Sequence, residues 1–167
     1  MSFKFIPASQ HLPESISSVQ IKNIRWHHRK IPLSHGGHMV GRYSPGPGRA
    51  PIRFESQAER KTIAHLDAQP GIRVVFSQPF TIDFCINGIC GWYTPDLLVV
   101  AEALPPKLAS KGFGLLTALE VKATIDPDPR STAILDFKLQ LVIRATGLPA
   151  MIAVPIADND QEARHAS

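Results

Sequence analysis

The chain has 167 residues, of which 44% are hydrophobic, and this is enough for one domain with a buried core. Its net charge of +4 is uneven: residues 1–61 carry ten Lys and Arg against three Asp and Glu, whereas residues 62–167 carry eight against eleven. The chain lacks both a run of 18 apolar residues and a secretory leader, which argues against a membrane protein and predicts a cytoplasmic one.

The basic N-terminal third suggests a polyanion partner, although ordinary solubilising charge explains it equally well. Residues 1–20 are expected to be flexible. Residues 21–53 are rich in Gly, Pro and basic residues without a helical period, which predicts an extended arm or long loop with short strands.

Residues 54–71 are predicted to form a helix that begins at the N-cap Ser56 and ends at Pro70-Gly71. Strands are expected at 72–76, 78–86, 89–93 and 96–100, with Asn87-Gly88 as a type I′ hairpin turn between the second and the third. Cys85 and Cys90 then pair across this turn. A cross-strand disulfide and two reduced thiols both remain open, and a cytoplasmic location favours the thiols.

The second half of the chain alternates between strands and helices. A loop at 102–113 precedes a strand at 115–122, and a turn at 125–130 leads to an amphipathic helix at 131–147 with Ser131 as its N-cap and Gly147 as its stop. A last strand is expected at 150–155. This order predicts an α/β fold with a mixed β-sheet flanked by helices.

The sequence "ALEVKAT" places two charged residues at the end of an apolar strand. Side chains alternate across a strand, so Glu120 and Lys122 share one face with Leu116 and Ala118. One interpretation is an ion pair where the strand leaves the core. The other is half of a metal-dependent nuclease site, which requires partners elsewhere in the chain.

Two further carboxylates are candidate partners. Asp96 follows Pro95 at the start of an apolar strand, where a simple turn aspartate is the alternative. Glu59 lies three residues after Ser56, which is the spacing of a helix capping box. It also shares a helical face with Ile63 and Leu66, where an unpaired carboxylate is costly.

These residue types suit the hydrolysis of a phosphodiester, which needs an activated water and neutralised phosphate oxygens. Mg²⁺ takes oxygen ligands, commonly a few carboxylates with waters and substrate phosphate. Asp96 and Glu120 are the predicted ligands, with the Val121 main-chain carbonyl and Glu59 as further candidates. Lys122 is predicted to stabilise the phosphate charge beside the attacking water.

"YTPDLLVV" followed by "LTALEVKAT" resembles the PD-(D/E)xK nuclease superfamily. Together with "GRAPIRFESQAERK" and "FSQPFTIDF", these motifs come in the order seen in TnsA-type endonucleases, the restriction-enzyme-like subunits of heteromeric transposases. The resemblance covers about residues 29–156. It implies a restriction-endonuclease-like core over residues 21–156, preceded by a basic arm, and a polar tail at 157–167.

Carried over by matching motif, the implied catalytic residues are Glu59, Asp96, Glu120 and Lys122. Gln78 in "SQPF" matches a recurring family position of unassigned role. The implied cofactor is Mg²⁺, with Mn²⁺ as a substitute. TnsA-type proteins carry a second, C-terminal domain, which the few residues after "AVP" do not supply, so this chain is expected to be the nuclease domain alone.

The basic arm is expected to contact the DNA backbone, in a salt-dependent and sequence-tolerant way. The candidate residues are Arg25, Arg29, Lys30, Arg42, Arg49 and Arg53.

The sequence thus predicts a Mg²⁺-dependent DNA endonuclease that cuts double-stranded DNA at the 5′ ends of a mobile element. The resemblance implies a DDE-type transposase subunit and an ATPase regulator as partners. A stand-alone restriction, repair or junction-resolving nuclease with the same core is one alternative. A non-catalytic DNA-binding or assembly subunit is the other.

Overall fold

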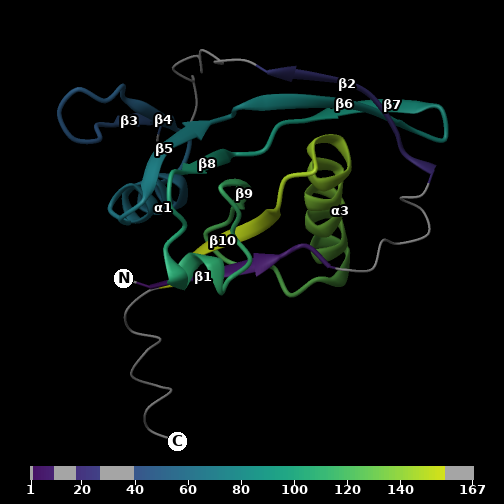
Figure 1. Cartoon of the computed structure of the whole chain (residues 1–167). Coiled ribbons are helices and arrows are strands. Elements are labelled where there is room, and N and C mark those ends of the chain that lie inside the picture. The colour runs from purple at the N-terminus through teal and green to yellow at the C-terminus, as the bar shows by residue number, and fades with distance from the viewer. Residues whose placement is uncertain (1, 10–17, 27–39, 157–167) are drawn as a thin grey trace, which may run out of the picture.

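Five strands form the main sheet of the computed structural model, which describes residues 2–9, 18–26 and 40–156 (Figure 1). Their order across the sheet is β1-β10-β9-β8-β5. Strands β9 and β10 pair in parallel, and every other neighbouring pair is antiparallel. The strands are β1 (Ser2–Pro7), β5 (Ile72–Ser77), β8 (Leu97–Ala101), β9 (Leu116–Val121) and β10 (Ala150–Ile156). The predicted α/β class and mixed sheet are confirmed.

Each face of this sheet has its own hydrophobic core. Leu119 and Val121 of β9 pack into the core beneath helix α1 (Gln57–Asp67), whereas Ala118 packs into the core beneath helix α3 (Pro129–Thr146). Alternating side chains of one strand therefore reach both layers, as the sequence predicted for the strand that carries Glu120.

A second, three-stranded sheet covers the α3 side, in the order β2-β6-β7. Its strands are β2 (Gln20–Trp26), β6 (Phe80–Ile86) and β7 (Ile89–Tyr93). Figure 1 shows this sheet along the top of the molecule with α3 beneath it. The predicted hairpin is confirmed: Asn87 and Gly88 both have positive φ, 50° and 81°, as a type I′ turn requires.

Cys85 and Cys90 face each other across this hairpin and are joined by a disulfide. The expectation of two reduced thiols is therefore wrong. The turn sets the two residues opposite each other with Cα atoms 4.0 Å apart, so the register alone brings the sulfur atoms together.

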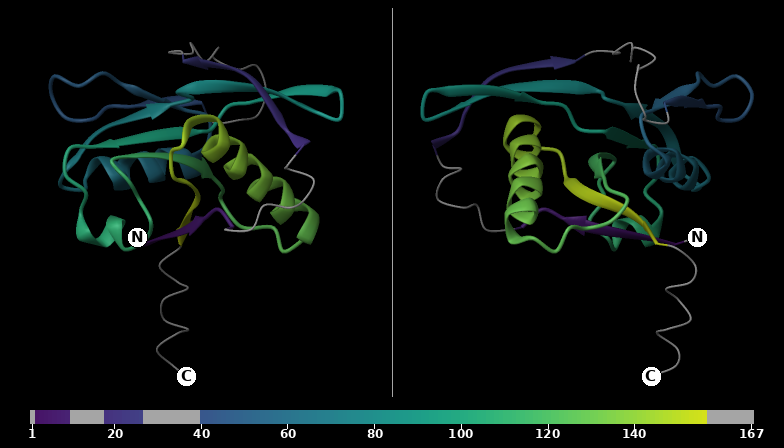
Figure 2. Two further views of the ribbon diagram at one scale, coloured as in Figure 1. Left: turned by 45° about the vertical axis from the view of Figure 1, so that its right-hand side comes forward. Right: turned by 180° about the vertical axis from the view of Figure 1, so that it is seen from behind.

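A small hairpin, formed by β3 (Gly41–Tyr43) and β4 (Ile52–Phe54), lies at the other end of the molecule. Figure 2 shows it projecting at the end opposite to the tip of the β6–β7 hairpin. Ile52 and Phe54 are buried in the α1 core and hold the hairpin to the body of the protein. With β2, these strands confirm the short strands expected in the basic arm.

Three local expectations are corrected. Part of the supposedly flexible N-terminus is strand β1, which pairs with β10 and buries Phe3 and Phe5. Helix α3 starts earlier than predicted, because Asp128 rather than Ser131 is its N-cap and Pro129 takes the first helical position. The loop at 102–113 contains a short helix, α2 (Pro106–Ala109). No helix in the described ranges has both the length and the apolar character to cross a membrane.

Candidate active site

Antiparallel pairing of β8 and β9 brings Asp96 beside the end of the "ALEVK" strand. Leu97 is the register partner of Leu119, so Asp96, one residue before β8, lies next to the last residues of β9. The Val121 amide donates a hydrogen bond of 2.7 Å to Asp96 Oδ2. The two motifs recognised in the sequence are therefore in direct contact.

The Asp96 carboxylate lies in an environment that opposes its negative charge. Burial is the largest cause, and the nearby Glu120 and Glu59 carboxylates add to it, so that the pKa of Asp96 is raised to about 7. The Val121 amide and the Lys122 ammonium oppose this shift without cancelling it. Three carboxylates from three elements thus share one electrostatic environment.

Gln78 holds the backbone of Asp96 in place. It lies between β5 and β6, and its amide donates a hydrogen bond of 2.8 Å to the Asp96 carbonyl. Gln78 is buried and has a φ of +47°, a left-handed conformation that costs free energy for a residue with a side chain. Gln78, whose role could not be assigned from the sequence, thus has a structural role in positioning the Asp96 backbone.

Glu120 is enclosed by hydrogen-bond donors. Its Oε1 accepts bonds from Lys122 Nζ and Lys138 Nζ, both at 2.9 Å, and its Oε2 accepts one of 2.5 Å from the Tyr93 hydroxyl. Burial alone would raise the pKa of Glu120, but the bonds from Tyr93 and Lys122 outweigh it and lower that pKa. The carboxylate is therefore held ionised although its side chain is only 3% exposed.

Glu59 takes part in the capping box of α1 and also faces the site. The Ser56 hydroxyl donates to Glu59 Oε1 at 2.9 Å, and the Glu59 amide donates to Ser56 Oγ at 3.1 Å. Glu59 is nevertheless buried on the face that carries Ile63 and Leu66. Burial raises the pKa of Glu59, and the Glu120 charge contributes in the same direction. The capping box is therefore confirmed, and a catalytic role for Glu59 stays a prediction.

Lys122 supplies positive charge to all three carboxylates. Burial disfavours its ammonium, but the hydrogen bond and charge of Glu120, with the charges of Asp96 and Glu59, raise its pKa above the ordinary value. Lys122 stays protonated at any pH near neutrality. Of the two interpretations of the E-x-K triplet, the ion pair between Glu120 and Lys122 is present, and it lies beside Asp96.

The oxygen-rich donor set fits a hard divalent cation such as Mg²⁺. Asp96 and Glu120 are close enough to raise the pKa of Asp96, and a cation would offset this repulsion. The amide and carbonyl of a strand residue point to the same edge, so the Val121 carbonyl faces the Asp96 side of β9 as its amide does. Within residues 2–9, 18–26 and 40–156, no group of three or more His, Cys, Asp or Glu is arranged to hold a metal ion. The fit therefore rests on two carboxylates and a main-chain oxygen.

The predicted DNA-binding residues divide into three groups. Arg25 forms an ion pair of 2.7 Å with Asp83 on the outer face of the β2–β6–β7 sheet. Arg29 and Lys30 lie outside the described residues. Arg42 and Arg53 are direct register partners across the β3–β4 hairpin, on the face opposite to the buried Ile52 and Phe54. Like charges placed directly opposite each other across two strands are unfavourable.

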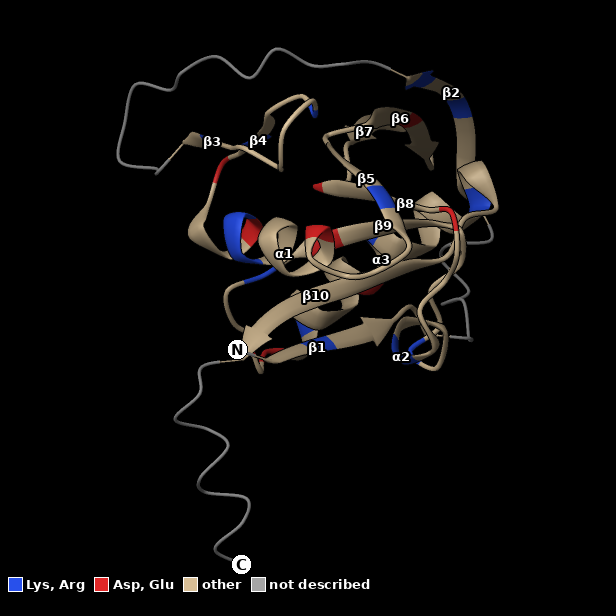
Figure 3. Cartoon of the chain, turned by 60° about the vertical axis from the view of Figure 1, so that its left-hand side comes forward, with Lys and Arg blue, Asp and Glu red and all other residues tan. Residues whose placement is uncertain are grey.

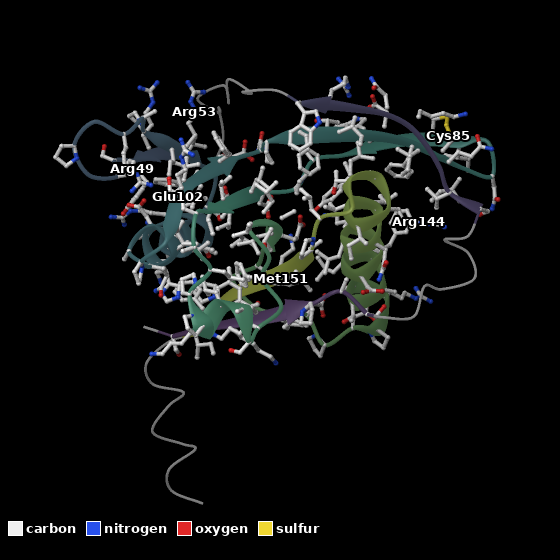
Figure 4. All side chains as sticks on the ribbon, viewed as in Figure 1. Arg49, Arg53, Cys85, Glu102, Arg144 and Met151 are labelled. Atoms are coloured by element: carbon white, nitrogen blue, oxygen red, sulfur yellow. A yellow bond between two sulfur atoms is a disulfide. The ribbon has the colours of Figure 1, made fainter. Side chains whose placement is uncertain are left out.

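Arg49 and Arg53 line a groove of about 540 Å³ between the β3–β4 hairpin and strand β5, together with Arg73. Figure 4 shows Arg49 and Arg53 at this end of the molecule, and Figure 3 shows further Lys and Arg on α1, β5 and β2. The β5 side of the groove runs from Arg73 to Ser77, the register partner of Leu97. One end of this basic groove therefore lies at Ser77, which pairs with the residue that follows Asp96 in the sequence.

Sequence reasoning did not assign Tyr93, Lys138 or Arg73 to the site. Tyr93 has an apolar neighbourhood and resembles a core residue, and Lys138 lies in an amphipathic helix 18 residues after Glu120. Lys138 lies three residues after Leu135 and four before Val142, a spacing that places it at the edge of the buried stripe of α3, and this was the available signal.

A scan against models of known protein families found no match for this chain, and a search of curated proteins found none either.

Proposed function

We propose that this protein is a divalent-metal-dependent DNA endonuclease with a restriction-endonuclease-like core. The observation that carries the proposal is the convergence of Glu59, Asp96, Glu120 and Lys122, which come from helix α1, the start of β8 and the end of β9. A buried carboxyl whose pKa is raised by its neighbours, beside a second carboxylate held ionised by lysines, supports a functional site.

In this proposal Asp96 and Glu120 hold the cation, with the Val121 carbonyl as a third ligand. When bound, Mg²⁺ supplies charge neutralisation at the phosphate oxygens and lowers the pKa of a water. Lys122 stabilises the charge that develops on the phosphate. A water oxygen bonds to phosphorus in line as the bond to O3′ breaks, and the leaving oxygen takes up a proton. The products carry 3′-hydroxyl and 5′-phosphate ends.

Double-stranded DNA is the proposed substrate, and the basic groove beside β5 is its proposed path to the site. Arg42 and Arg53 lie side by side on the outer face of the hairpin. Arg49 and Arg73 flank the groove, where Arg49 is paired with Asp67 and Arg73 with Glu102. Arginines so arranged match phosphate oxygens through their planar donors. Contacts of this kind position the backbone and are sequence-tolerant.

The order of the four sequence motifs supports a narrower role, that of the nuclease subunit of a heteromeric transposase that cuts the 5′ ends of a mobile element. A separate DDE-type transposase then cuts the 3′ ends, and an ATPase regulates both. This role predicts little cleavage by the chain alone.

The test is nicking of supercoiled plasmid in Mg²⁺ or Mn²⁺, with and without any DDE-type transposase that a neighbouring gene encodes. Asp96→Ala is the test variant, and Asp126→Asn, which removes an exposed carboxylate in the turn before α3, is the control. Cleavage that needs Asp96 and the transposase supports the full proposal. Asp96-dependent cleavage without the transposase supports a stand-alone nuclease. No cleavage under either condition contradicts the enzymatic proposal and favours an assembly subunit.

A further inference from the structure

Lys138 is the second ammonium on Glu120, and it comes from a different element than Lys122. It lies on α3 at the edge of the buried stripe, three residues after Leu135 and four before Val142, and its side chain is 32% exposed. Its Nζ is 2.9 Å from Glu120 Oε1 and 5.2 Å from the centre of the Tyr93 ring. Lys138 is therefore held in the site by both a carboxylate and an aromatic face.

Both ammonium groups bind the same oxygen. Lys122 Nζ and Lys138 Nζ each lie 2.9 Å from Glu120 Oε1, while Oε2 accepts from the Tyr93 hydroxyl. Both acceptor sites of Oε1 are thereby occupied, so a cation that binds Glu120 through Oε1 has to displace one of the two lysines. It also adds two positive charges to a cluster whose three carboxylates already face two ammonium groups.

The two lysines differ in the stabilising interactions that they keep once a cation binds Glu120. Lys122 is also stabilised by the charges of Asp96 and Glu59, and its backbone amide is fixed to the Ala153 carbonyl at 3.0 Å. Within the described part of the chain, the only salt bridge of Lys138 is the one to Glu120. Lys138 is thus the group that a bound cation displaces.

We propose that Lys138 exchanges with the cation: it occupies Glu120 in the cation-free protein and turns to the substrate phosphate once the cation binds. This inference rests on the proposed function. It assigns Lys138 two opposite effects, because the residue competes with the cation when DNA is absent and attracts the phosphate when the cation is present. A residue that only supports the fold would produce neither effect.

The first test is Mn²⁺ binding without DNA, measured from the electron paramagnetic resonance signal of the free ion. Lys138→Met is expected to lower the Kd for Mn²⁺ about tenfold, the effect of removing one charge-assisted hydrogen bond from the cation-free state. Lys107→Met, which removes an exposed lysine from α2, is the control and is expected to change nothing. Lys138→Arg keeps the charge and is expected to bind Mn²⁺ like the wild type.

The second test is affinity for a short DNA duplex, in Ca²⁺ and in a chelator. The wild type is expected to gain more affinity from Ca²⁺ than Lys138→Met does, because only the wild type has a displaced ammonium to offer the phosphate. Circular dichroism verifies that the variants fold, and Lys138→Gln replaces the Met variant if that one does not.

The outcomes distinguish a failure of the lysine–cation exchange from a failure of the proposed nuclease function. If the wild type binds Mn²⁺ through Asp96 but Lys138→Met leaves the Kd unchanged or raises it, the exchange is wrong and the nuclease proposal stands. A wild type whose Mn²⁺ binding is absent or insensitive to Asp96→Ala contradicts the metal site, and the exchange falls with it. A lower Kd in Lys138→Met together with a smaller Ca²⁺ effect on DNA affinity supports the exchange.

Discussion

Asp96 accepts a hydrogen bond of 2.7 Å from the Val121 amide, and this bond ties the start of β8 to the end of β9. It leaves Asp96 beside Glu120 and Glu59, whose charges, with burial, raise its pKa from 3.8 to about 7. Below about pH 7 the protonated carboxyl is thus the favoured form in the folded, cation-free protein. Its stabilising effect is full below the unfolded pKa and is lost as the pH rises towards the folded pKa.

The first prediction follows from this loss of stability with rising pH. Asp96→Asn mimics the protonated carboxyl, so its free energy of unfolding should match the wild type near about pH 3 and exceed it by about 4 kcal/mol near about pH 8. Urea unfolding in a chelator at several pH values measures the difference. A difference that stays constant over this range would contradict the raised pKa, and Glu102→Gln controls for the loss of one negative charge.

Glu59 allows its structural and chemical roles to be separated. Ser56→Ala removes the hydroxyl of the capping box and is expected to cost about 1 kcal/mol of stability while leaving cleavage intact. Glu59→Gln keeps a side chain that can reach the cap but removes the charge, and is expected to lower the cleavage rate about tenfold or more. Thermal unfolding and plasmid nicking on both variants give the comparison. Cleavage at the wild-type rate by Glu59→Gln would leave only the capping role.

Lys122 is expected to act on the phosphate and not on folding. Lys122→Met should lower the cleavage rate by about 10²–10³, because the charge that stabilises the transition state is lost. DNA affinity should change far less. The raised pKa of Lys122 keeps it protonated, but its charge also lowers the pKa of Asp96, so the loss should be greater near about pH 6 than near about pH 9. Single-turnover cleavage across that range tests this, and a loss that grows as the pH rises would indicate that Lys122 itself titrates.

Arg42 and Arg53 are expected to bind DNA through its phosphates. Replacing both with Ala should weaken binding to all sequences alike and reduce the slope of log Kd against log salt by about 1 for each phosphate that the variant no longer neutralises. Arg144→Ala is the control, since Figure 4 shows Arg144 on α3, away from this end of the molecule. A slope unchanged in the double variant would remove the hairpin from the DNA path.

Local signals predicted much of the fold. Ser56 caps α1, Asn87-Gly88 turns the hairpin, and Gly147 ends α3 with a φ of +72°, each for the reason that the residue type implies. Strand β1 was missed although Phe3 and Phe5 are buried and Lys4 is exposed, which is the alternation of a strand. A six-residue strand ending in Pro7 depends on its partner β10, and that pairing cannot be read locally.

Only those residues of the candidate site that lie in recognisable local motifs could be predicted from the sequence. Motif spacing identified Asp96, Glu120 and Lys122, because each lies at a recognisable strand end. Tyr93 and Lys138 reach Glu120 from a different sheet and from a helix, and their sequence contexts resemble ordinary core positions. The disulfide was undecided because register makes it geometrically possible, whereas the redox environment is not written in the residues.

The capping box of α1 has a consequence for measuring the site. The Glu55 amide donates a hydrogen bond of 3.0 Å to Glu59 Oε2, so a backbone proton reports directly on a carboxylate of the cluster. Local opening of this first helical turn and release of Glu59 are then one event. Deuterium exchange of the Glu55 amide would therefore measure this local opening directly, without DNA and without turnover.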